Sequence, residues 1–313
     1  MDRPAPTVSV VVPCYNAEST VRRAVASALA QTAPPDAVVC VDDGSSDGTV
    51  GVLRELAAED GRVRVLTGPN RGACAARNRG LAEATGTYVQ FLDADDALDA
   101  GKFDAQVEIA ERAGADFVAG ASRYQAPGRE PRVDRPRAGN PWVRLIEKEL
   151  GNTAANLWRR SAVEAVGGWD AAWPSSQEAD LMARLLKNGA AVAYDLEPRA
   201  TVYGQEGSIS FAFSGPNRER YARVRADALA FAEAQGLVGG ADLDDAREAL
   251  FNALRWLYPS NPEAALEIYR RALPARYVPP VSAFNTRPYV TLSRLVGFDR
   301  AERLRRALGR GDG

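Results

Sequence analysis

The chain has 313 residues, of which 46% are hydrophobic and 26% charged, and its formal net charge is −2. This composition suits one large domain or two modest ones. It argues against a disordered chain and against the basic surface of a nucleic-acid-binding protein. The sequence has no run of 18 apolar residues, so we expect no transmembrane helix, and the short polar segment from Met1 to Thr7 predicts no signal peptide.

The three cysteines and the absence of histidine limit the catalytic and metal-binding chemistry that this chain can use. The three cysteines, Cys14, Cys40 and Cys74, lack metal-ligand spacing, and we interpret them as reduced structural thiols of a cytoplasmic protein. The chain contains no histidine, which removes the commonest general base and the commonest transition-metal ligand. Any acid–base or metal chemistry must therefore use carboxylates.

Strands and helices alternate through the first 121 residues. The β-branched run from Val8 to Val12 ends at Pro13 and predicts a buried parallel strand. Apolar residues spaced as one helical face from Val21 to Leu29 predict the first helix. Further strands are predicted at 37–41, 63–66, 88–92 and 116–121, and further helices around 52–56 and at 73–84 and 102–113. This alternation predicts a mostly parallel sheet, whose ligands bind beyond the carboxyl ends of the strands. The polar clusters after Val12, Val41 and Leu92 fall at that edge.

The second half of the chain is less regular. Residues 127–141 are rich in Pro, Gly and Arg and predict a loop or irregular hairpin near the acceptor side. Two helices are predicted at 161–166 and 180–187, followed by an extended segment at 192–203. A boundary at 214–217 precedes a helical region with predicted helices at 218–235, 243–257, 262–273 and 289–308.

Three carboxylates, Asp93, Asp95 and Asp96, lie within four residues at a predicted strand end. Such a cluster is often only a capped turn, but the carboxylates repel one another unless a cation or solvent relieves them. Hard oxygen ligands suit Mg²⁺ or Mn²⁺, commonly with phosphate oxygens completing the shell. The cluster is therefore a candidate metal site.

Four motifs, each weak alone, are specific when taken in order. The segments 8–16 (VSVVVPCYN), 41–49 (VDDGSSDGT), 70–80 (NRGACAARNRG) and 91–96 (FLDADD) resemble successive motifs of the family 2 glycosyltransferases, the last being their Asp-x-Asp metal motif. The resemblance continues more weakly to about Ser210, and the C-terminal third resembles nothing diagnostic. It implies an α/β GT-A fold over residues 1–214, with a nucleotide-sugar half at 1–121 and an acceptor half at 122–214, and leaves 215–313 as a helical extension.

The resemblance also implies roles for individual residues in an inverting, metal-assisted transfer. Residues expected around the nucleotide are Pro13, Tyr15, Glu18, Asp43, Arg77 and Asp95. Within this set Tyr15 would stack on the base, Asp43 would accept a hydrogen bond from it, and Arg77 would lie near the base or the diphosphate. The cation, Mn²⁺ or Mg²⁺, would be held by Asp95 or Asp96 with Asp93 nearby. The alternatives are core packing for Tyr15 and a plain surface position for Arg77.

In the family, the general base belongs to a Glu-Asp pair ahead of Trp-Asp-Leu and an Arg. The corresponding stretch here begins with Gln177-Glu178-Ala179-Asp180. The register favours Glu178 as base, with Asp180 as the second candidate. Asp180 and Arg184 could instead form an ordinary ion pair four residues apart on a helix. The family often has a histidine near residues 203–208, where this chain offers only Gln205 or Glu206 as oxygen ligands.

The resulting hypothesis is a cytoplasmic glycosyltransferase that uses a uridine or thymidine diphosphate sugar and an acceptor hydroxyl on a glycan, lipid-linked glycan, protein or natural product. Gln177 and the missing histidine favour, as an alternative, a nucleotide-sugar-binding protein without turnover. A sugar nucleotidyltransferase would need a Gly-rich, Arg-containing loop after the first strand, which is not found here. Ten arginines and two acidic residues between Arg270 and Arg310 indicate a solvated helical cap, contact with an anionic inner-membrane face or a phosphate-bearing acceptor, or a homodimer interface.

Overall fold

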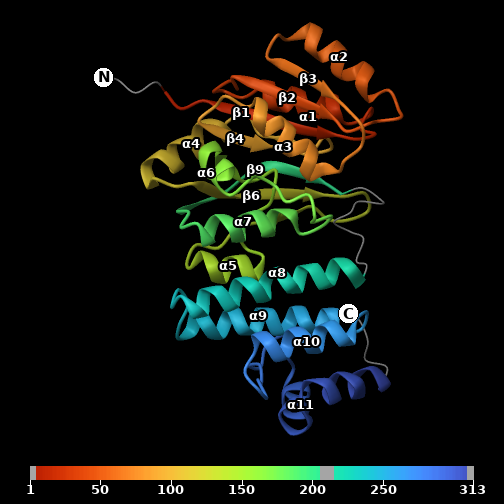
Figure 1. Ribbon diagram of the computed structural model, residues 1–313, viewed down its shortest axis with the longest axis vertical. Coiled ribbons are helices and arrows are strands. Elements are labelled where there is room, and N and C mark those ends of the chain that lie inside the picture. The colour runs from red at the N-terminus through yellow and green to blue at the C-terminus, as the bar shows by residue number, and fades with distance from the viewer. Residues whose placement is uncertain (1–4, 205–214, 309–313) are drawn as a thin grey trace. The chain divides into compact units, whose positions relative to one another are not determined.

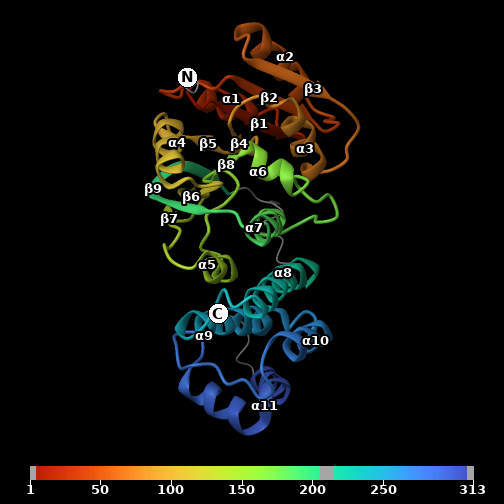
Figure 2. The same ribbon diagram turned by 60° about the vertical axis from the view of Figure 1, so that its left-hand side comes forward.

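The computed structural model describes residues 5–204 and 215–308, and the chain divides into two compact units. The described part of the first unit comprises residues 5–141 and 148–204, and that of the second comprises 142–147 and 215–308. Figures 1 and 2 together label the elements of both units. Of the boundary expected at 214–217, residue 214 lies outside the described residues, and residues 215–217 are the first residues of the helix Gly215–Ala234. Residues 142–147, expected within the acceptor half, group instead with the second unit.

A mixed sheet forms the centre of the first unit, with the strand order β3-β2-β1-β4-β8-β6-β9-β5 and β7 beside β6 in the described part of the chain. The first four strands are parallel, as predicted, whereas β8 runs antiparallel to both β4 and β6. The strands are β1 (Val8–Cys14), β2 (Ala37–Asp42), β3 (Val63–Thr67), β4 (Tyr88–Phe91), β5 (Ala97–Leu98), β6 (Phe117–Gln125), β7 (Arg132–Asp134), β8 (Leu157–Arg159) and β9 (Val192–Tyr203).

Helices cover both faces of this sheet, because successive strand residues point to opposite sides. Val10 and Val12 of β1 pack in one core with α1, α2 and α4, while Val39 and Val41 of β2 pack on the other face with Ala76 of α3. The helices of this unit are α1 (Val21–Leu29), α2 (Thr49–Glu59), α3 (Ala73–Glu83), α4 (Lys102–Ala113), α6 (Arg160–Ala165) and α7 (Gln177–Lys187). These positions agree with the predicted helices.

Helix α3 lies unusually close to β1, and a glycine permits this approach. A Cβ atom built on Gly80 would lie 2.3 Å from a methyl carbon of Val11, which is far inside van der Waals contact. Any larger residue at position 80 would push the helix away from the sheet. The Ala-Arg-Asn-Arg-Gly motif therefore seats α3 on β1 and fixes where its polar side chains Arg77 and Asn78 lie.

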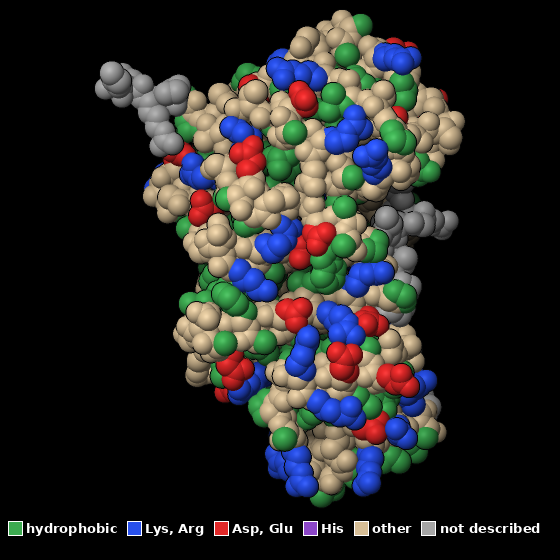
Figure 3. All heavy atoms as spheres, in the orientation of Figure 1, with side chains coloured by type: hydrophobic (Ala, Val, Ile, Leu, Met, Phe, Trp, Pro, Cys, Tyr) green, Lys and Arg blue, Asp and Glu red, His purple; other side chains and the backbone are tan. Residues whose placement is uncertain are grey.

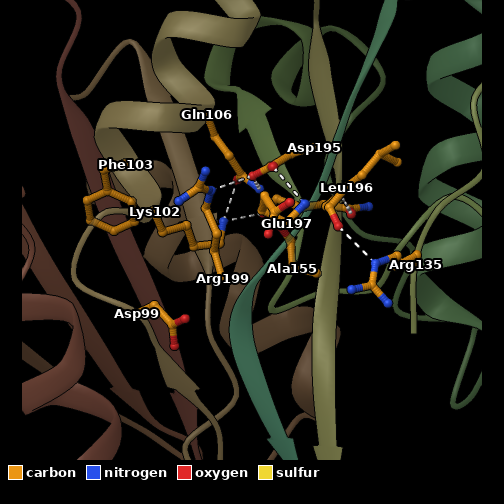
Figure 4. Close-up of polar contacts among 12 residues, drawn as sticks. Asp99, Lys102, Phe103, Gln106, Arg135, Ala155, Asp195, Leu196, Glu197 and Arg199 are labelled. Carbon is orange, nitrogen blue, oxygen red and sulfur yellow. Dashed lines mark hydrogen bonds and ion pairs between the residues drawn. The ribbon is translucent and has the colours of Figure 1, made fainter. Parts of the chain in front are cut away.

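A buried polar network crosses the sheet beneath α4 (Figure 4). The ammonium of Lys102 is fully buried and donates to the side-chain oxygens of Gln90, at 2.5 Å, and Gln106, at 2.6 Å. Gln106 in turn donates to Asp195 of β9, which also accepts from Arg199 at 2.9 Å. Burial lowers the pKa of Lys102 to about 7.

The second unit is helical. It contains α5 (Pro141–Glu147), α8 (Gly215–Ala234), α9 (Ala241–Leu257), α10 (Pro262–Ala272) and α11 (Arg287–Ala307), with the first residue of α5 belonging to the first unit. The four C-terminal helices were predicted, with ends that differ by a few residues. Helix α5 joins them because the ring of Trp142 packs at a tilt against that of Phe231 of α8, with centroids 5.3 Å apart, and Arg225 donates to the carbonyl of Ile146.

Aromatic rings form the core of this second unit. The ring of Phe251 contacts four others, at centroid distances of 5.3 to 6.4 Å, namely those of Tyr269, Tyr277, Tyr289 and Phe298. Beside them Arg255 and the fully buried Glu302 form an ion pair at 3.1 Å that ties α9 to α11. Helix α11 is kinked at Gly297, whose φ of 80° is outside the helical region.

Three short elements were not predicted: β5, β8 and α5. The first two are two and three residues long, too short for a periodic pattern to emerge. The predicted loop at 127–141 does contain a hairpin, because β7 pairs antiparallel with β6. Among the described residues, the model has no helix that is both long and apolar enough to cross a membrane.

Candidate active site

The loops after β1 and β2 meet at the carboxyl edge of the sheet, as expected from neighbouring parallel strands. The backbone N–H of Asn16 donates to the hydroxyl of Ser45 at 2.9 Å, and the N–H of Ser46 donates to the side-chain oxygen of Asn16 at 2.8 Å. Asn16 has a φ of 49°, a left-handed conformation that asparagine tolerates better than most residues. This reciprocal pair holds the two loops together.

The residues expected to line the base pocket, Pro13, Tyr15 and Glu18, differ in exposure and in whether they already form a hydrogen bond. Tyr15 is 55% exposed, so it does not pack in the core and its ring is available to a ligand. Pro13 is half-buried within β1. Glu18 accepts a hydrogen bond from the backbone N–H of Gly48 at 3.0 Å and thereby closes the turn before α2. Of the three, Tyr15 has the geometry of a stacking platform.

Asp43 is buried and joins the end of β2 to the loop before α3. Its two carboxylate oxygens accept the backbone N–H groups of Arg71, at 2.9 Å, and Gly72, at 2.7 Å. An ionised carboxylate has about four acceptor positions, so two remain for a ligand. Asp43 therefore shapes the loop from which α3 begins, and it retains the capacity to accept a further hydrogen bond.

Arg77 of α3 is the centre of the site, only 5% exposed rather than on the surface. Its guanidinium donates to the carboxylate of Asp93 at 2.6 Å and to the side-chain oxygen of Gln177 at 2.7 Å, and it lies 4.6 Å from the ring of Trp169. Burial opposes its charge, but Asp93, with a smaller contribution from Glu178, outweighs the burial and raises the pKa of Arg77. The buried Nε of this guanidinium has no partner among the described residues.

The acidic cluster after β4 separates into three environments. Asp93 is paired with Arg77. Asp96 is buried, and its carboxylate accepts the backbone N–H of Tyr203 at 3.1 Å. Asp95 is half-buried, and no described side chain donates a hydrogen bond to its carboxylate. Among the residues that the model describes, no three acidic or sulfur side chains converge as a metal-binding group. Asp95 is thus the carboxylate most available to a cation.

Neither Asp95 nor Asp96 forms an ion pair with a described residue, and the surroundings of both disfavour the charged carboxylate. Burial, followed by the charge of Asp93, raises the pKa of Asp95. Burial, followed by Asp93 and Asp95, raises the pKa of Asp96 well above its ordinary value. Carboxylates that repel one another in a partly dry setting are stabilised by a nearby cation. Asp95, with Asp93 close by, is therefore the candidate ligand for a divalent cation at this edge.

Helix α7 brings the two candidate bases to the same region, but their partners differ. Asp180 accepts two hydrogen bonds from Arg184, at 2.7 and 2.9 Å, and Arg184 also donates to the carbonyls of Val166 and Gly168. The helix ion pair considered from the sequence is confirmed, and Asp180 serves to anchor α7. Glu178, in the first turn, is half-buried and has no hydrogen bond or ion pair with any described residue.

Two supporting residues, Asn78 and Arg23, were not identified from the sequence. Asn78 both donates to and accepts from the backbone of Trp169, at 2.7 and 2.8 Å, which fixes the indole beneath Arg77. Arg23 of α1 donates to the carbonyl of Asp95, and its guanidinium lies 3.9 Å over the ring of Tyr203. Asn78 lies inside a recognised motif, but Arg23 has no sequence signal that separates it from an ordinary exposed arginine. Gln205 and Glu206, considered as ligands, lie outside the described residues.

Comparisons with known proteins agree with this geometry. Residues 9–163 match the model of Glycosyl transferase family 2. The uncharacterized glycosyltransferase EpsJ of Bacillus subtilis is 36% identical over 113 residues, which are 36% of this chain and 33% of EpsJ. Chondroitin synthase of Pasteurella multocida is 41% identical over 95 residues, 30% of this chain and 10% of that protein. The chain belongs to the family 2 glycosyltransferases.

A solved structure extends the likeness to nearly the whole fold. The crystal structure of S. aureus TarS 1-349 in complex with UDP-GlcNAc aligns with a TM-score of 0.65 and 16% identity, covering 96% of this chain and 92% of the other. At that identity the likeness concerns the fold, which is of the GT-A type expected from the sequence. The matched segment spans 33% of EpsJ, 42% of each of two further curated relatives, and 10% of chondroitin synthase.

Proposed function

We propose that this protein transfers a sugar from a nucleoside-diphosphate donor to an acceptor hydroxyl, with inversion at the anomeric carbon. The observation that carries the proposal is the position of Arg77, which links the acidic loop at Asp93 to the start of α7 at Gln177. One buried guanidinium thereby holds the acidic loop on the candidate leaving-group side and Gln177, the residue next to the candidate base Glu178. Family membership supports the same reaction class.

Inversion requires a single displacement. The acceptor oxygen forms a bond to the anomeric carbon while the bond from that carbon to the diphosphate oxygen breaks, and the bonding electron pair leaves with the diphosphate. Glu178 takes the acceptor proton, because its carboxylate has no competing partner, whereas that of Asp180 is occupied by Arg184. Tyr15 stacks on the base, and Asp43 accepts a hydrogen bond from it.

A divalent cation, Mn²⁺ or Mg²⁺, fits the donor set through Asp95, with Asp93 close by and phosphate oxygens and water completing the shell. When bound, such an ion neutralises charge that develops on the leaving diphosphate. Asp96 supports this loop from within by its bond to Tyr203. The exposed ring of Tyr15 and the free acceptor positions of Asp43 support a uridine or thymidine diphosphate sugar as donor, and TarS has been solved with UDP and with UDP-GlcNAc.

The test is turnover of a panel of UDP- and dTDP-sugars with Mn²⁺, followed by release of nucleoside diphosphate. An enzyme hydrolyses its donor slowly even without acceptor, and release should depend on both metal and Glu178. Gln177, which stands where the family usually has an acidic residue, favours a second candidate, a nucleotide-sugar-binding protein without turnover. Tight donor binding without release of nucleoside diphosphate from any donor would select that alternative.

A further inference from the structure

Exposed apolar side chains concentrate near the C-terminal end of the second unit. Nine large hydrophobic residues are exposed in the described parts of the chain, and five of them lie between residues 281 and 308. Leu295 and Leu308 are the most exposed of all, at 77% and 72%. Single exposed leucines are ordinary on protein surfaces, but their concentration in one short stretch is not.

Most of the arginines between residues 270 and 308 form no ion pair with a described residue. Residues 270–308 contain nine arginines against Asp299 and Glu302. Glu302 is fully buried and already paired with Arg255 and Arg305, and Asp299 is paired with Arg303. Six exposed arginines of this segment form no ion pair or side-chain hydrogen bond with any described residue: Arg270 of α10, and Arg276, Arg287, Arg294, Arg300 and Arg306. Although the net charge of the chain is −2, no ion-pair partner among the described residues neutralises these arginines.

Helix α11 places these two kinds of side chain together. Figures 1 and 2 both show α11 as the outermost layer of the second unit, and Figure 3 shows separate basic side chains at that end, as elsewhere on the same face. Before the kink, the exposed residues Arg287, Thr291, Arg294 and Leu295 follow a helical spacing opposite the buried Tyr289, Val290 and Ser293. After it, Arg300, Arg303, Leu304 and Ala307 do the same opposite Phe298, Ala301 and Glu302.

We propose that the side chains exposed on the two halves of α11 and directly after its end, namely Arg287, Arg294, Leu295, Arg300, Leu304, Arg306 and Leu308, bind the surface of an anionic lipid bilayer. Unpaired arginines complement lipid phosphates, and leucines between them can enter the boundary between headgroups and acyl chains. A symmetric dimer would place this arginine-rich surface against itself, and because Asp299 and Glu302 are already paired, the arginines of the two copies would repel one another. Exposed leucines likewise contribute little to nucleic-acid binding, which uses phosphate contacts and aromatic stacking.

Vesicle co-sedimentation of the full chain tests the proposal. Binding to vesicles of phosphatidylcholine with about one third phosphatidylglycerol should exceed binding to pure phosphatidylcholine, and it should fall at high salt because screening weakens the attraction. The double variant Arg294→Glu with Arg306→Glu should reduce the partition coefficient at least about tenfold, since each basic residue near such a surface contributes about a factor of five. Leu295→Gln with Leu308→Gln should weaken binding with little change in its salt dependence.

The matched control is Arg54→Glu with Arg64→Glu, which changes the net charge equally at two exposed, unpaired arginines of the first unit. This control should bind vesicles like the unchanged chain. The proposal is overturned if no binding to anionic vesicles occurs at low salt, or if both charge-reversal pairs reduce binding equally. It is also overturned if light scattering without lipid shows a dimer that the α11 variants dissociate, because the face would then belong to a second copy. Donor binding is measured separately and should not change.

Discussion

Arg77 and Gln177 are 100 residues apart in the chain, and a hydrogen bond of 2.7 Å joins them. The other arm of the same guanidinium holds Asp93 at 2.6 Å. Because the guanidinium is planar and buried, its two arms fix the direction in which both partners lie. The start of α7, with Glu178 beside Gln177, is therefore set in position by the same residue that orients the acidic loop.

This relationship predicts the effect of Arg77→Lys. A lysine keeps the charge but has a single ammonium, so it cannot reproduce both directed contacts. We expect kcat for sugar transfer to fall at least about tenfold and the free energy of unfolding to fall by about 1–3 kcal/mol. Arg79→Lys is the control on the same helix, because Arg79 donates only to the carbonyl of Thr67. Equal kcat values for the two variants would remove Arg77 from the account.

The acidic loop predicts different outcomes for Asp95 and Asp96. Asp95→Asn should abolish the dependence of UDP binding on Mn²⁺, since its carboxylate is the one without a hydrogen-bond donor. Asp96→Asn should keep that dependence, because the carboxylate of Asp96 is buried and bonded to Tyr203. Isothermal titration with and without Mn²⁺ measures both. Loss of metal dependence in Asp96→Asn alone would move the ligand to Asp96.

The nucleotide pocket predicts a separation between affinity and stability. Tyr15→Ala should weaken UDP binding by about 1–3 kcal/mol through lost stacking and leave the fold unchanged, because the ring is exposed. Asp43→Asn should weaken the discrimination between UDP and CDP more than Tyr15→Phe does. It should also destabilise the loop at Arg71 and Gly72, which hydrogen exchange of those amides would detect. Unchanged selectivity and protection in Asp43→Asn would contradict this role.

The buried Lys102 predicts a pH dependence of stability. Its pKa is about 7 in the folded protein and near 10.5 when unfolded, so above pH 7 the unfolded chain binds a proton that the folded chain lacks. Stability should therefore rise with pH between about 7 and 9, by at most about 1.4 kcal/mol per pH unit. Lys102→Met should lack this component. Urea unfolding of the unchanged protein and of Lys102→Met, at about pH 7 and about pH 9, gives the change in the free energy of unfolding with pH for each. The same change in both proteins would refute a contribution from Lys102.

Local patterns predicted most of the fold of the first unit. The β-branched runs, the helical faces and the order of polar clusters are properties of neighbouring residues, so they are visible without the structure. Strand β8 and helix α5 were not predicted, because each is stabilised by partners that are distant in the sequence. These partners are β4 and β6 for β8, and Phe231 for Trp142 of α5. Such partners leave no periodic signal in a segment of three to seven residues.

The site was predictable in composition more than in geometry. Tyr15, Arg77 and the acidic cluster were recognised, but the sequence did not indicate that Arg77 bridges Asp93 and Gln177 across the sheet edge. It also gave no indication of Lys102, because lysine is ordinarily exposed and only Gln90 and Gln106 make its burial tolerable. Long-range pairing of polar groups is the information that the structure adds.

Glu178→Gln tests the central claim most directly. The substitution keeps the size and shape of the side chain and removes only its ability to take a proton. In a single-turnover assay with a nucleotide-sugar donor, Mn²⁺ and acceptor, we expect donor affinity to stay within about twofold and the transfer rate to fall about 10²–10⁴-fold. Asp180→Asn, which loses the anchor to Arg184, should instead lower stability and retain transfer at permissive temperature. Transfer by Glu178→Gln at the rate of the unchanged enzyme would contradict the account.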